Sequence, residues 1–309
     1  MESAAFARDS LDARKTHFVE IDGIRTRYYE DGAGEPLVLI HGGNYGSLYS
    51  LDAWSLVLDA LAARFHVYAF DKLGQGYTDA PSDPDGFTFA AVWRHADRLL
   101  ERLNIQDAHL VGHSRGGLLA AWLAFERPGL ARSLVVVDSQ TLAADDPSFS
   151  PGKFYQEIEA RTPPGPPSAA SVRLEPDAQS FSTRHVTEDF VARMLAIAEL
   201  PKSEACLRLW RQGGQATWYT TLEPVRAEAL RRIDTLGLPV PTLVIWGYND
   251  VSALLTLHGL PLFSRIAART PRSELHVINE AGHYVFREQP EAFARAVSTF
   301  CGADWPAEP

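Results

Sequence analysis

Residues 108–122 read AHLVGHSRGGLLAAW, an apolar run followed by a serine flanked by glycines and then by a helical pattern. A serine on a sharp turn between a strand and a helix needs neighbours without side chains, because the backbone is strained and the helix passes close to the strand. Gly112 and Gly116 meet that need. The stretch therefore predicts an exposed Ser114 hydroxyl beyond the end of a strand, with a helix N-terminus behind it.

That arrangement has a chemical use, because the N–H groups and positive potential of a helix N-terminus stabilise a developing oxyanion. We therefore predict that Ser114 is a nucleophile and that the backbone N–H of Arg115 is one oxyanion donor. An ordinary glycine-rich turn is the alternative interpretation of the same residues.

Short apolar runs recur along the chain, at residues 36–40, 66–70, 108–111, 134–137, 241–246 and 274–278. Runs that are apolar on both faces are typical of strands covered on both sides, and hence of a parallel sheet. Helical patterns at 54–64, 89–103 and 290–300 alternate with them. Two further runs, 17–21 and 24–29, flank Asp22-Gly23 and predict a hairpin. The expected fold class is α/β with a mostly parallel, doubly wound sheet.

The alternation stops near Gln140 and resumes after Leu236. Between them lie helical patterns and a proline-rich stretch, residues 162–167, that cannot form a regular element. We interpret residues 140–236 as an inserted helical lid, and residues 1–139 and 237–309 as the core domain.

Composition narrows the functional classes. Acidic residues outnumber basic ones 39 to 29, for a net charge of −10, which argues against a nucleic-acid partner. Cys206 and Cys301 are the two cysteines and have no CxxC spacing, so neither a disulfide framework nor a thiolate metal site is expected. No secretion signal and no run of about 18 apolar residues is present. We expect a soluble cytoplasmic protein without a membrane partner.

Cofactor motifs are weak. Gly74 and Gly76 form a GxG after an apolar run, but Asp79 occupies the third glycine position of a dinucleotide fingerprint, so a structural loop is favoured. The ten histidines include no HExxH spacing. We expect no metal and no cofactor.

Reactive groups in open parallel sheets gather at the carboxyl ends of the strands. Asp250 follows the run 241–246, and His283 follows the last run. His283 would accept the Ser114 proton, while Asp250 would hold the tautomer of the ring. Asp138, at the end of the run 134–137, stays open as an alternative acid. For His283 the alternative is a capping or core role.

The second oxyanion donor is expected in the loop His41-Gly42-Gly43-Asn44 that follows the run 36–40. We choose the backbone N–H of Gly43, because a residue without a side chain lets the backbone approach the substrate. A tight turn with no catalytic role is the alternative.

Together these residues resemble the α/β-hydrolase superfamily, which has the chain order Ser, Asp, His. Within it the chain looks most like the meta-cleavage product hydrolases, serine-dependent enzymes that cut a carbon–carbon bond in vinylogous 1,5-diketones formed by aromatic ring fission. The segments that carry this likeness are residues 41–43, 112–116, 244–250 and 282–291. The resemblance implies a small-molecule substrate and is compatible with a homo-oligomer.

The chain departs from that family at three places. His113 and Arg115 stand where Asn and Met usually flank the nucleophile, and Tyr284 stands where Trp commonly follows the histidine. Arg193 falls one position from the lid arginine that grips the carboxylate of the substrate. The residues that we expect to contact substrate are Gly42, Asn44, His113, Arg193, Trp218 and Tyr284.

Arg115 needs an anionic partner, since a cation in the first turn of a helix opposes the macrodipole by about 0.3–1 kcal/mol. An internal salt bridge, for example to Asp138, is favoured over a carboxylate of the substrate.

The leading functional hypothesis is a cofactor-independent serine hydrolase that cleaves a carbon–carbon bond in a ring-fission acid. A carboxylesterase or lactonase is the second hypothesis, because the same machinery serves both reactions. A noncatalytic binding protein with this fold is the third.

Overall fold

The computed structural model describes residues 9–303, which fold around one eight-stranded sheet. The strands are β1 (Thr16–Ile21), β2 (Ile24–Gly32), β3 (Pro36–Ile40), β4 (His66–Phe70), β5 (Ala108–His113), β6 (Ala131–Val137), β7 (Thr242–Gly247) and β8 (Ser273–Ile278). Their order is β1-β2-β4-β3-β5-β6-β7-β8. β2 pairs antiparallel with β1 and β4, and the other pairs are parallel, so the mostly parallel sheet is confirmed.

The first two strands form the predicted hairpin. Ile21 pairs with Ile24, which leaves the two-residue turn Asp22-Gly23. Both turn residues have positive φ, +49° and +81°, as a type I′ turn requires.

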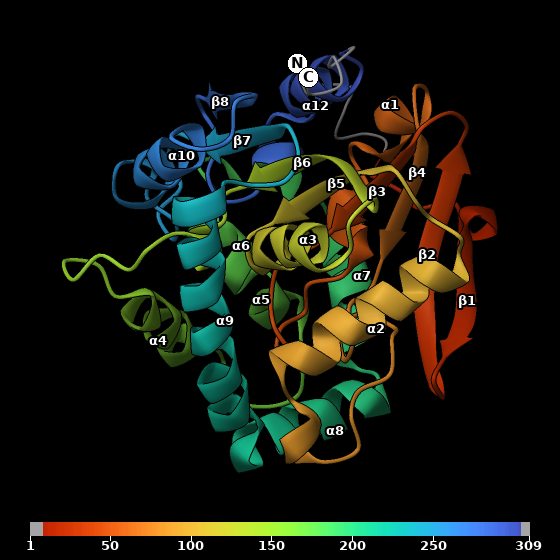
Figure 1. The fold of residues 1–309 in the computed structure, drawn as a ribbon. Coiled ribbons are helices and arrows are strands. Elements are labelled where there is room, and N and C mark those ends of the chain that lie inside the picture. The colour runs from red at the N-terminus through yellow and green to blue at the C-terminus, as the bar shows by residue number, and fades with distance from the viewer. Residues whose placement is uncertain (1–8, 304–309) are drawn as a thin grey trace.

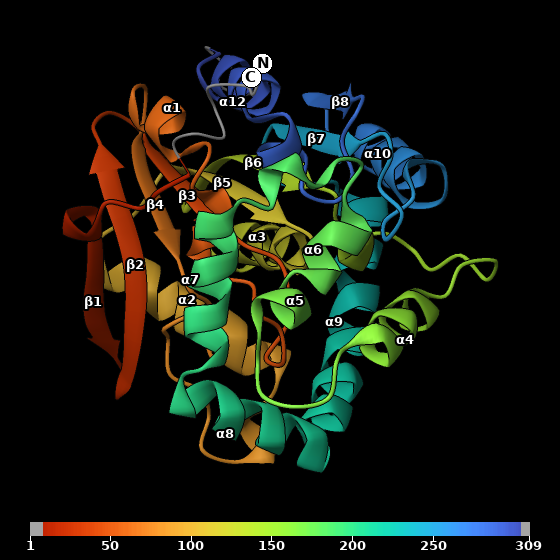
Figure 2. The ribbon, with the colours of Figure 1, turned by 180° about the vertical axis from the view of Figure 1, so that it is seen from behind.

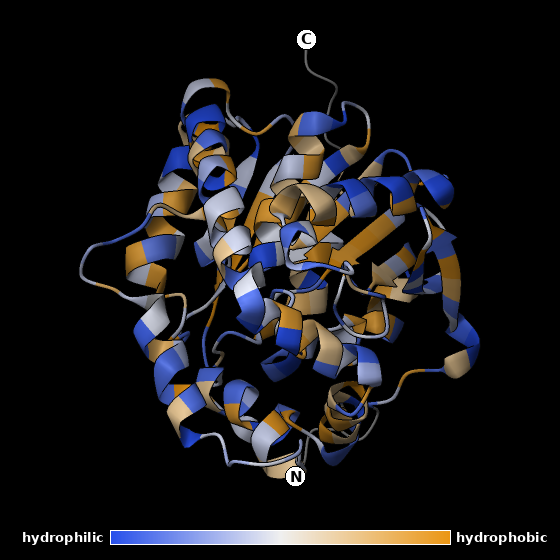
Figure 3. Ribbon diagram, turned by 90° about the horizontal axis from the view of Figure 1, so that it is seen from below, coloured by the Kyte–Doolittle hydropathy of each residue, from blue (hydrophilic) through white to orange (hydrophobic). Residues whose placement is uncertain are grey.

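Alternate residues of the central strands are buried on opposite faces of the sheet. On β3, Val38 and Ile40 join one apolar cluster, and Leu37 and Leu39 join the other. The first cluster lies under α2 (Phe89–Arg102), α3 (Arg115–Glu126) and α10 (Leu260–Ala267), and the second under α1 (Leu58–Ala62) and α12 (Pro290–Cys301) (Figure 1). Figure 3 shows the hydrophobic strands between helices of mixed hydropathy. Burial on both faces explains the nearly continuous apolar runs.

One predicted helix is only partly right. Residues 54–64 contain the end of a 3₁₀ helix, Leu51–Trp54, and the short helix α1. Side chains at the start of this segment are engaged in tertiary contacts instead: Asp52, just before it, pairs with Arg27 at 2.8 Å, and the Ser55 hydroxyl accepts from Arg287 at 2.9 Å. Such contacts override the helical pattern.

The chain between β6 and β7 is helical, as expected, and residues 162–167 lie outside its helices. The α-helices here are α4 (Pro151–Arg161), α5 (Ala169–Val172), α6 (Leu174–Gln179), α7 (Glu188–Ala198), α8 (Pro201–Leu209) and α9 (Gln215–Leu236) (Figure 2). We call residues 140–236 the β6–β7 insertion; its status as a separate domain stays a prediction. Across residues 9–303, no helix is long and apolar enough to cross a membrane.

Candidate active site

Ser114 occupies the bend between β5 and α3, and its backbone has φ +52° and ψ −121°. The bend is possible because its flanking glycines lie against backbone. A Cβ on Gly112 would overlap the Gly116 carbonyl, and one on Gly116 would overlap the Ile40 carbonyl. The Ser114 N–H donates to the Val137 carbonyl at 2.8 Å, which ties the bend to β6. The local sequence therefore fixes a strained serine at the carboxyl end of the sheet.

His283 lies in the loop between β8 and α11 (Val285–Glu288). Its Nδ1 lies 2.6 Å from Asp250 Oδ2. The other oxygen of Asp250 accepts from Ser252 N at 2.7 Å, Ser252 Oγ at 2.9 Å and Ala253 N at 2.8 Å. A carboxylate held in this way fixes a tautomer with the proton on Nδ1 and the lone pair on Nε2.

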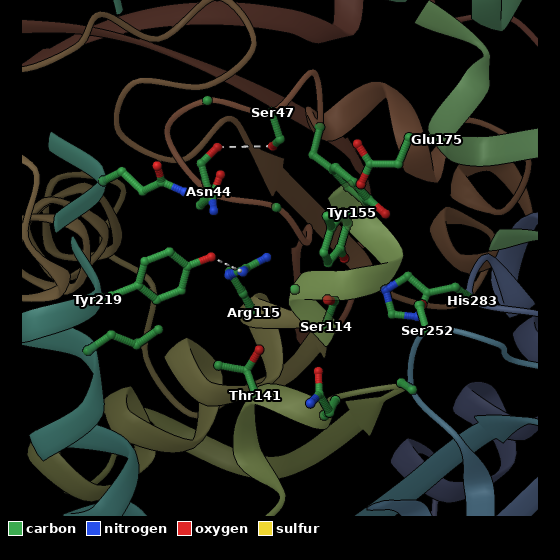
Figure 4. A pocket seen from close by; sticks show the side chains of 18 of the residues that line it. Asn44, Ser47, Ser114, Arg115, Thr141, Tyr155, Glu175, Tyr219, Ser252 and His283 are labelled. Carbon is green, nitrogen blue, oxygen red and sulfur yellow. Dashed lines mark hydrogen bonds between the residues drawn. The ribbon is translucent and has the colours of Figure 1, made fainter. Parts of the chain in front are cut away.

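Nε2 of His283 is buried and has no hydrogen-bond partner within residues 9–303, Ser114 included. His283 and Ser114 nevertheless line the same cavity (Figure 4). Catalytic hydrogen bonds are often long without substrate and tighten when it binds. The structure thus brings the predicted base, acid and nucleophile to one place, with the basic nitrogen unoccupied.

Asp138, the alternative acid, has a different partner. Its Oδ1 accepts from the Gly247 N–H at 2.8 Å, between β6 and β7. Burial, reinforced by the negative charge of Asp250, raises the pKa of Asp138 well above its usual range. The geometry favours Asp250 as the partner of His283.

The expected internal salt bridge of Arg115 is wrong. Within the described chain, Arg115 forms no ion pair, with Asp138 or any other carboxylate, and its guanidinium donates to the Tyr219 hydroxyl at 3.4 Å. Arg115 Nε is buried without a partner. Asp138 is instead occupied by backbone of the neighbouring strand, which the sequence pattern did not reveal.

The loop after β3, which we expect to supply an oxyanion donor, is held by side-chain contacts. Gly43 has φ +73°, and a Cβ there would overlap the Ser47 hydroxyl. His41 Nδ1 lies 2.8 Å from the Gly42 carbonyl, whose peptide carries the Gly43 N–H. His41 Nε2 accepts from the Lys72 N–H at 3.1 Å, so Nδ1 is the donor. Gly43, Arg115 and Ser114 line the same cavity.

Lys72 supports the same loop from beneath. It is buried, and its ammonium donates to the Gly43 carbonyl at 2.8 Å. Burial and the positive charge of Arg115 hold the pKa of Lys72 well below its usual range. Sequence analysis did not identify Lys72 and His41 as residues that hold this loop. The only indication in the sequence was that each follows a strand.

The cavity above Ser114, which we call the Ser114 cavity, has a volume of about 580 Å³. Strand ends supply Gly43, Asn44 and Ser114, and the β6–β7 insertion supplies Tyr155, Glu175 and Tyr219 (Figure 4). Sequence analysis did not single out Tyr155 or Glu175, since the cavity they line is formed with residues far away in the sequence, such as Gly43 and Ser114.

A second cavity of about 900 Å³, the Phe190 cavity, adjoins the first. The two share wall residues, among them Tyr49, Tyr155 and Glu175. Its other walls include the apolar side chains Leu48, Phe190, Met194 and Ile197. The site therefore has a polar chamber at Ser114 beside a more apolar one.

Asn44 lines the Ser114 cavity as expected, but Gly42 does not. A Cβ on Gly42 would lie 3.0 Å from the Ser114 Cβ, so this glycine packs against the bend. His113 is also corrected: it is fully buried, and its Nε2 donates to the His283 carbonyl at 2.8 Å. His113 therefore holds the backbone of His283 and does not line the Ser114 cavity.

Trp218 is a correction too. Its buried ring packs edge-on against Tyr45, with centroids 5.5 Å apart, and it lines neither cavity. The next residue, Tyr219, faces the Ser114 cavity instead. Tyr284 stacks on Tyr49 at 5.6 Å and lines the Phe190 cavity.

Arg193 forms ion pairs with buried carboxylates and does not line the Ser114 cavity. Its Nη2 lies 2.6 Å from Asp9, and its Nε lies 3.5 Å from Asp52. Asp9 also pairs with Arg287 at 2.6 Å. The expected contact of Arg193 with substrate is wrong, because a buried carboxylate takes its charge.

Comparison with known proteins identifies the family. The family described as an alpha/beta hydrolase fold matches residues 35–290. The 2-hydroxymuconate semialdehyde hydrolase of Pseudomonas sp. strain CF600 is 32% identical over 279 residues, 90% of each chain. That of Pseudomonas putida is 31% identical over 288 residues, 90% of this chain and 91% of the relative.

Among solved structures, a variant of the meta-cleavage product hydrolase CumD from Pseudomonas fluorescens IP01 superposes with a TM-score of 0.72. It is 24% identical, and the match covers 94% of this chain and 99% of that one. At this identity the likeness establishes the fold. The chain therefore belongs to the α/β-hydrolase family, within which it is similar to the meta-cleavage product hydrolases.

Proposed function

We propose that this protein is a serine hydrolase that cleaves a carbon–carbon bond in a vinylogous 1,5-diketone acid of the ring-fission type. The observation that carries the chemistry is the free Nε2 of His283, whose Nδ1 is held by Asp250, in the cavity that contains Ser114. The substrate class is supported by the two 2-hydroxymuconate semialdehyde hydrolases that match 90% of the chain.

In the proposed first step, Ser114 Oγ attacks the ketone carbon, and His283 Nε2 takes the serine proton. The ketone oxygen becomes an oxyanion, which the N–H groups of Gly43 and Arg115 stabilise. The loop is already held by His41 and Lys72, so little reorganisation is needed when charge develops.

In the second step the carbon–carbon bond breaks. Its electron pair is delocalised over the dienoate fragment as a dienolate, whose oxygen takes the proton from His283, and the fragment leaves as the enol acid. The other fragment remains as an ester on Ser114. A water molecule, deprotonated by His283, then attacks this ester, and the carboxylic acid is released as the serine regains its proton.

The assay that tests this proposal compares two substrate classes on one enzyme. We expect a yellow ring-fission acid to be hydrolysed with a higher kcat/KM than 4-nitrophenyl esters of small acids, and Ser114→Ala to abolish both activities. Ester turnover that is faster by orders of magnitude would favour a carboxylesterase or lactonase. No turnover of either class would favour a binding protein.

A further inference from the structure

The Ser114 cavity is lined by two arginines, and one of them is already neutralised. Arg226, on α9, pairs with Glu223 at 2.9 Å and with Asp145 at 2.8 Å. Its guanidinium also donates to the Thr141 carbonyl at 3.0 Å and the Ala143 carbonyl at 3.2 Å. Arg226 therefore has no spare capacity for a ligand anion.

Arg115, unlike Arg226, is not neutralised by a carboxylate of the described chain. Its side chain is half-buried at the start of α3, beside Ser114, and forms no ion pair within residues 9–303. Its one side-chain hydrogen bond is the 3.4 Å contact with Tyr219, and its Nε is buried without a partner. A guanidinium has five donors, and a carboxylate can accept two of them at once. This cation at a helix N-terminus opposes the helix dipole, and no carboxylate of the described residues neutralises its charge.

Arg193 does not supply a positive charge to the Ser114 cavity. Its guanidinium is bound by Asp9 and Asp52 on the core side of α7, outside the lining of the Ser114 cavity. Arg115 is thus the one arginine at this cavity with donors to spare in the described chain.

The Ser114 cavity has two arms, one on the side of Arg115 and one on the side of His283, and an acidic side chain lines the second (Figure 4). Glu175 is half-buried, lines both cavities, and forms no ion pair within the described residues. Figure 4 shows Arg115 with Tyr219 on one side of Ser114, and Glu175 with Tyr155 on the side of His283. Burial raises the pKa of Glu175, and the positive charge of Arg115 counteracts that rise. The two arms therefore differ in electrostatic character.

We propose that Arg115 binds the carboxylate of the substrate and that Glu175 excludes a second anion from the other arm. The substrate class is then a keto acid with one carboxylate, on the dienoate fragment, and an uncharged group on the acyl fragment. This inference rests on the proposed function for the identity of the substrate, but it makes a binding prediction of its own.

The test measures binding without turnover. In the Ser114→Ala protein, the dissociation constants of a ring-fission acid and of its methyl ester are determined by absorbance titration. We expect the acid to bind at least about 10-fold more tightly than the ester. Arg115→Met should weaken acid binding by about 10- to 100-fold and ester binding by less than about 3-fold, and Arg115→Lys should restore part of the loss.

The matched control is Arg193→Met in the same background, or Arg193→Lys if the first variant does not fold. We expect the preference for acid over ester to persist there. Glu175→Gln should strengthen binding of an analogue with a second carboxylate on the acyl fragment. An unchanged preference in Arg115→Met, or its loss in the Arg193 variant, overturns the inference.

The two proposals fail in different ways. If the enzyme with Ser114 intact does not cleave ring-fission acids but the Ser114→Ala protein still prefers acid over ester through Arg115, the proposed function is wrong and the carboxylate site stands. If cleavage occurs but Arg115→Met leaves the preference intact, the carboxylate site is wrong.

Discussion

Asp250 Oδ2 lies 2.6 Å from His283 Nδ1, whereas Asp138, at the end of the neighbouring strand, accepts from the Gly247 backbone. The two carboxyl groups are close enough for the charge of Asp250 to raise the pKa of Asp138, yet they have separate partners. The structure therefore assigns them different tasks: one orients the imidazole, and the other joins β6 to β7.

Substitution of the two aspartates tests this assignment. Asp250→Asn should lower kcat by about 10,000-fold, because the amide favours the wrong tautomer of His283. Asp138→Asn should lower kcat by less than about 10-fold, because the raised pKa of Asp138 favours a neutral side chain already. Single-turnover kinetics measure both effects. A larger loss in Asp138→Asn than in Asp250→Asn would reverse the assignment.

Gly43→Ala tests the oxyanion hole. The added Cβ would overlap the Ser47 hydroxyl and lie 2.8 Å from the Tyr49 Cβ, at a backbone with φ +73°. The loop must shift, so we expect kcat to fall by about 100- to 1000-fold with little change in KM. Gly129→Ala is the control for strain, since its φ of +83° is similar and nothing lies within 4 Å of the added atom. Equal losses of activity in the two variants would remove Gly43 from the mechanism.

Asp9→Asn tests the buried ion cluster that holds Arg193. Asp9 pairs with Arg193 and with the fully buried Arg287. Asn would leave Arg287 without a charge partner and Arg193 with Asp52 alone. Breaking a buried pair by removing one member costs about 3–5 kcal/mol. Urea denaturation at neutral pH should show a loss of that order in the free energy of unfolding. A loss below about 1 kcal/mol would mean that the cluster contributes little to stability.

Glu288 gives the fold a dependence on pH. Burial raises the pKa of this carboxyl to about 7, although its hydrogen bonds to the N–H groups of Ser182 and Gly282 oppose the rise. The folded state then binds a proton more tightly than the unfolded state, so the stabilisation is complete below about pH 4.5 and is lost as pH rises through 7.

From about pH 5 to about pH 8, we therefore expect the stability of the protein relative to Glu288→Gln to fall by about 2–3 kcal/mol. Urea titrations of both proteins at several pH values measure the difference. A difference that is constant with pH, or that grows as pH rises, contradicts the assigned direction.

Local patterns were sufficient to predict the sheet and the strained serine. The runs 36–40 and 66–70 coincide with β3 and β4, because strands buried on both faces leave an uninterrupted apolar signature. Gly112 and Gly116 predicted the bend correctly, because backbone atoms lie so close to both that a side chain would not fit.

The side chains that line the cavity were harder to predict, for identifiable reasons. Trp218 and Tyr219 are adjacent on α9, but one step along a helix turns a side chain by about 100°, so one packs in the core and the other faces the cavity. Arg193 matches a family position approximately, but its partner Asp9 is 184 residues away in sequence. Contacts at that separation have no local signal.

The central claim is that His283 makes the Ser114 hydroxyl nucleophilic, and covalent labelling tests it most directly. The protein is incubated with a fluorophosphonate, and the modified residue is located by peptide mass spectrometry. We predict one adduct, on Ser114, that is absent in Ser114→Ala and forms at least about 1000-fold more slowly in His283→Ala. An adduct on another residue, or an unlabelled Ser114 in protein that still turns over substrate, would contradict the account.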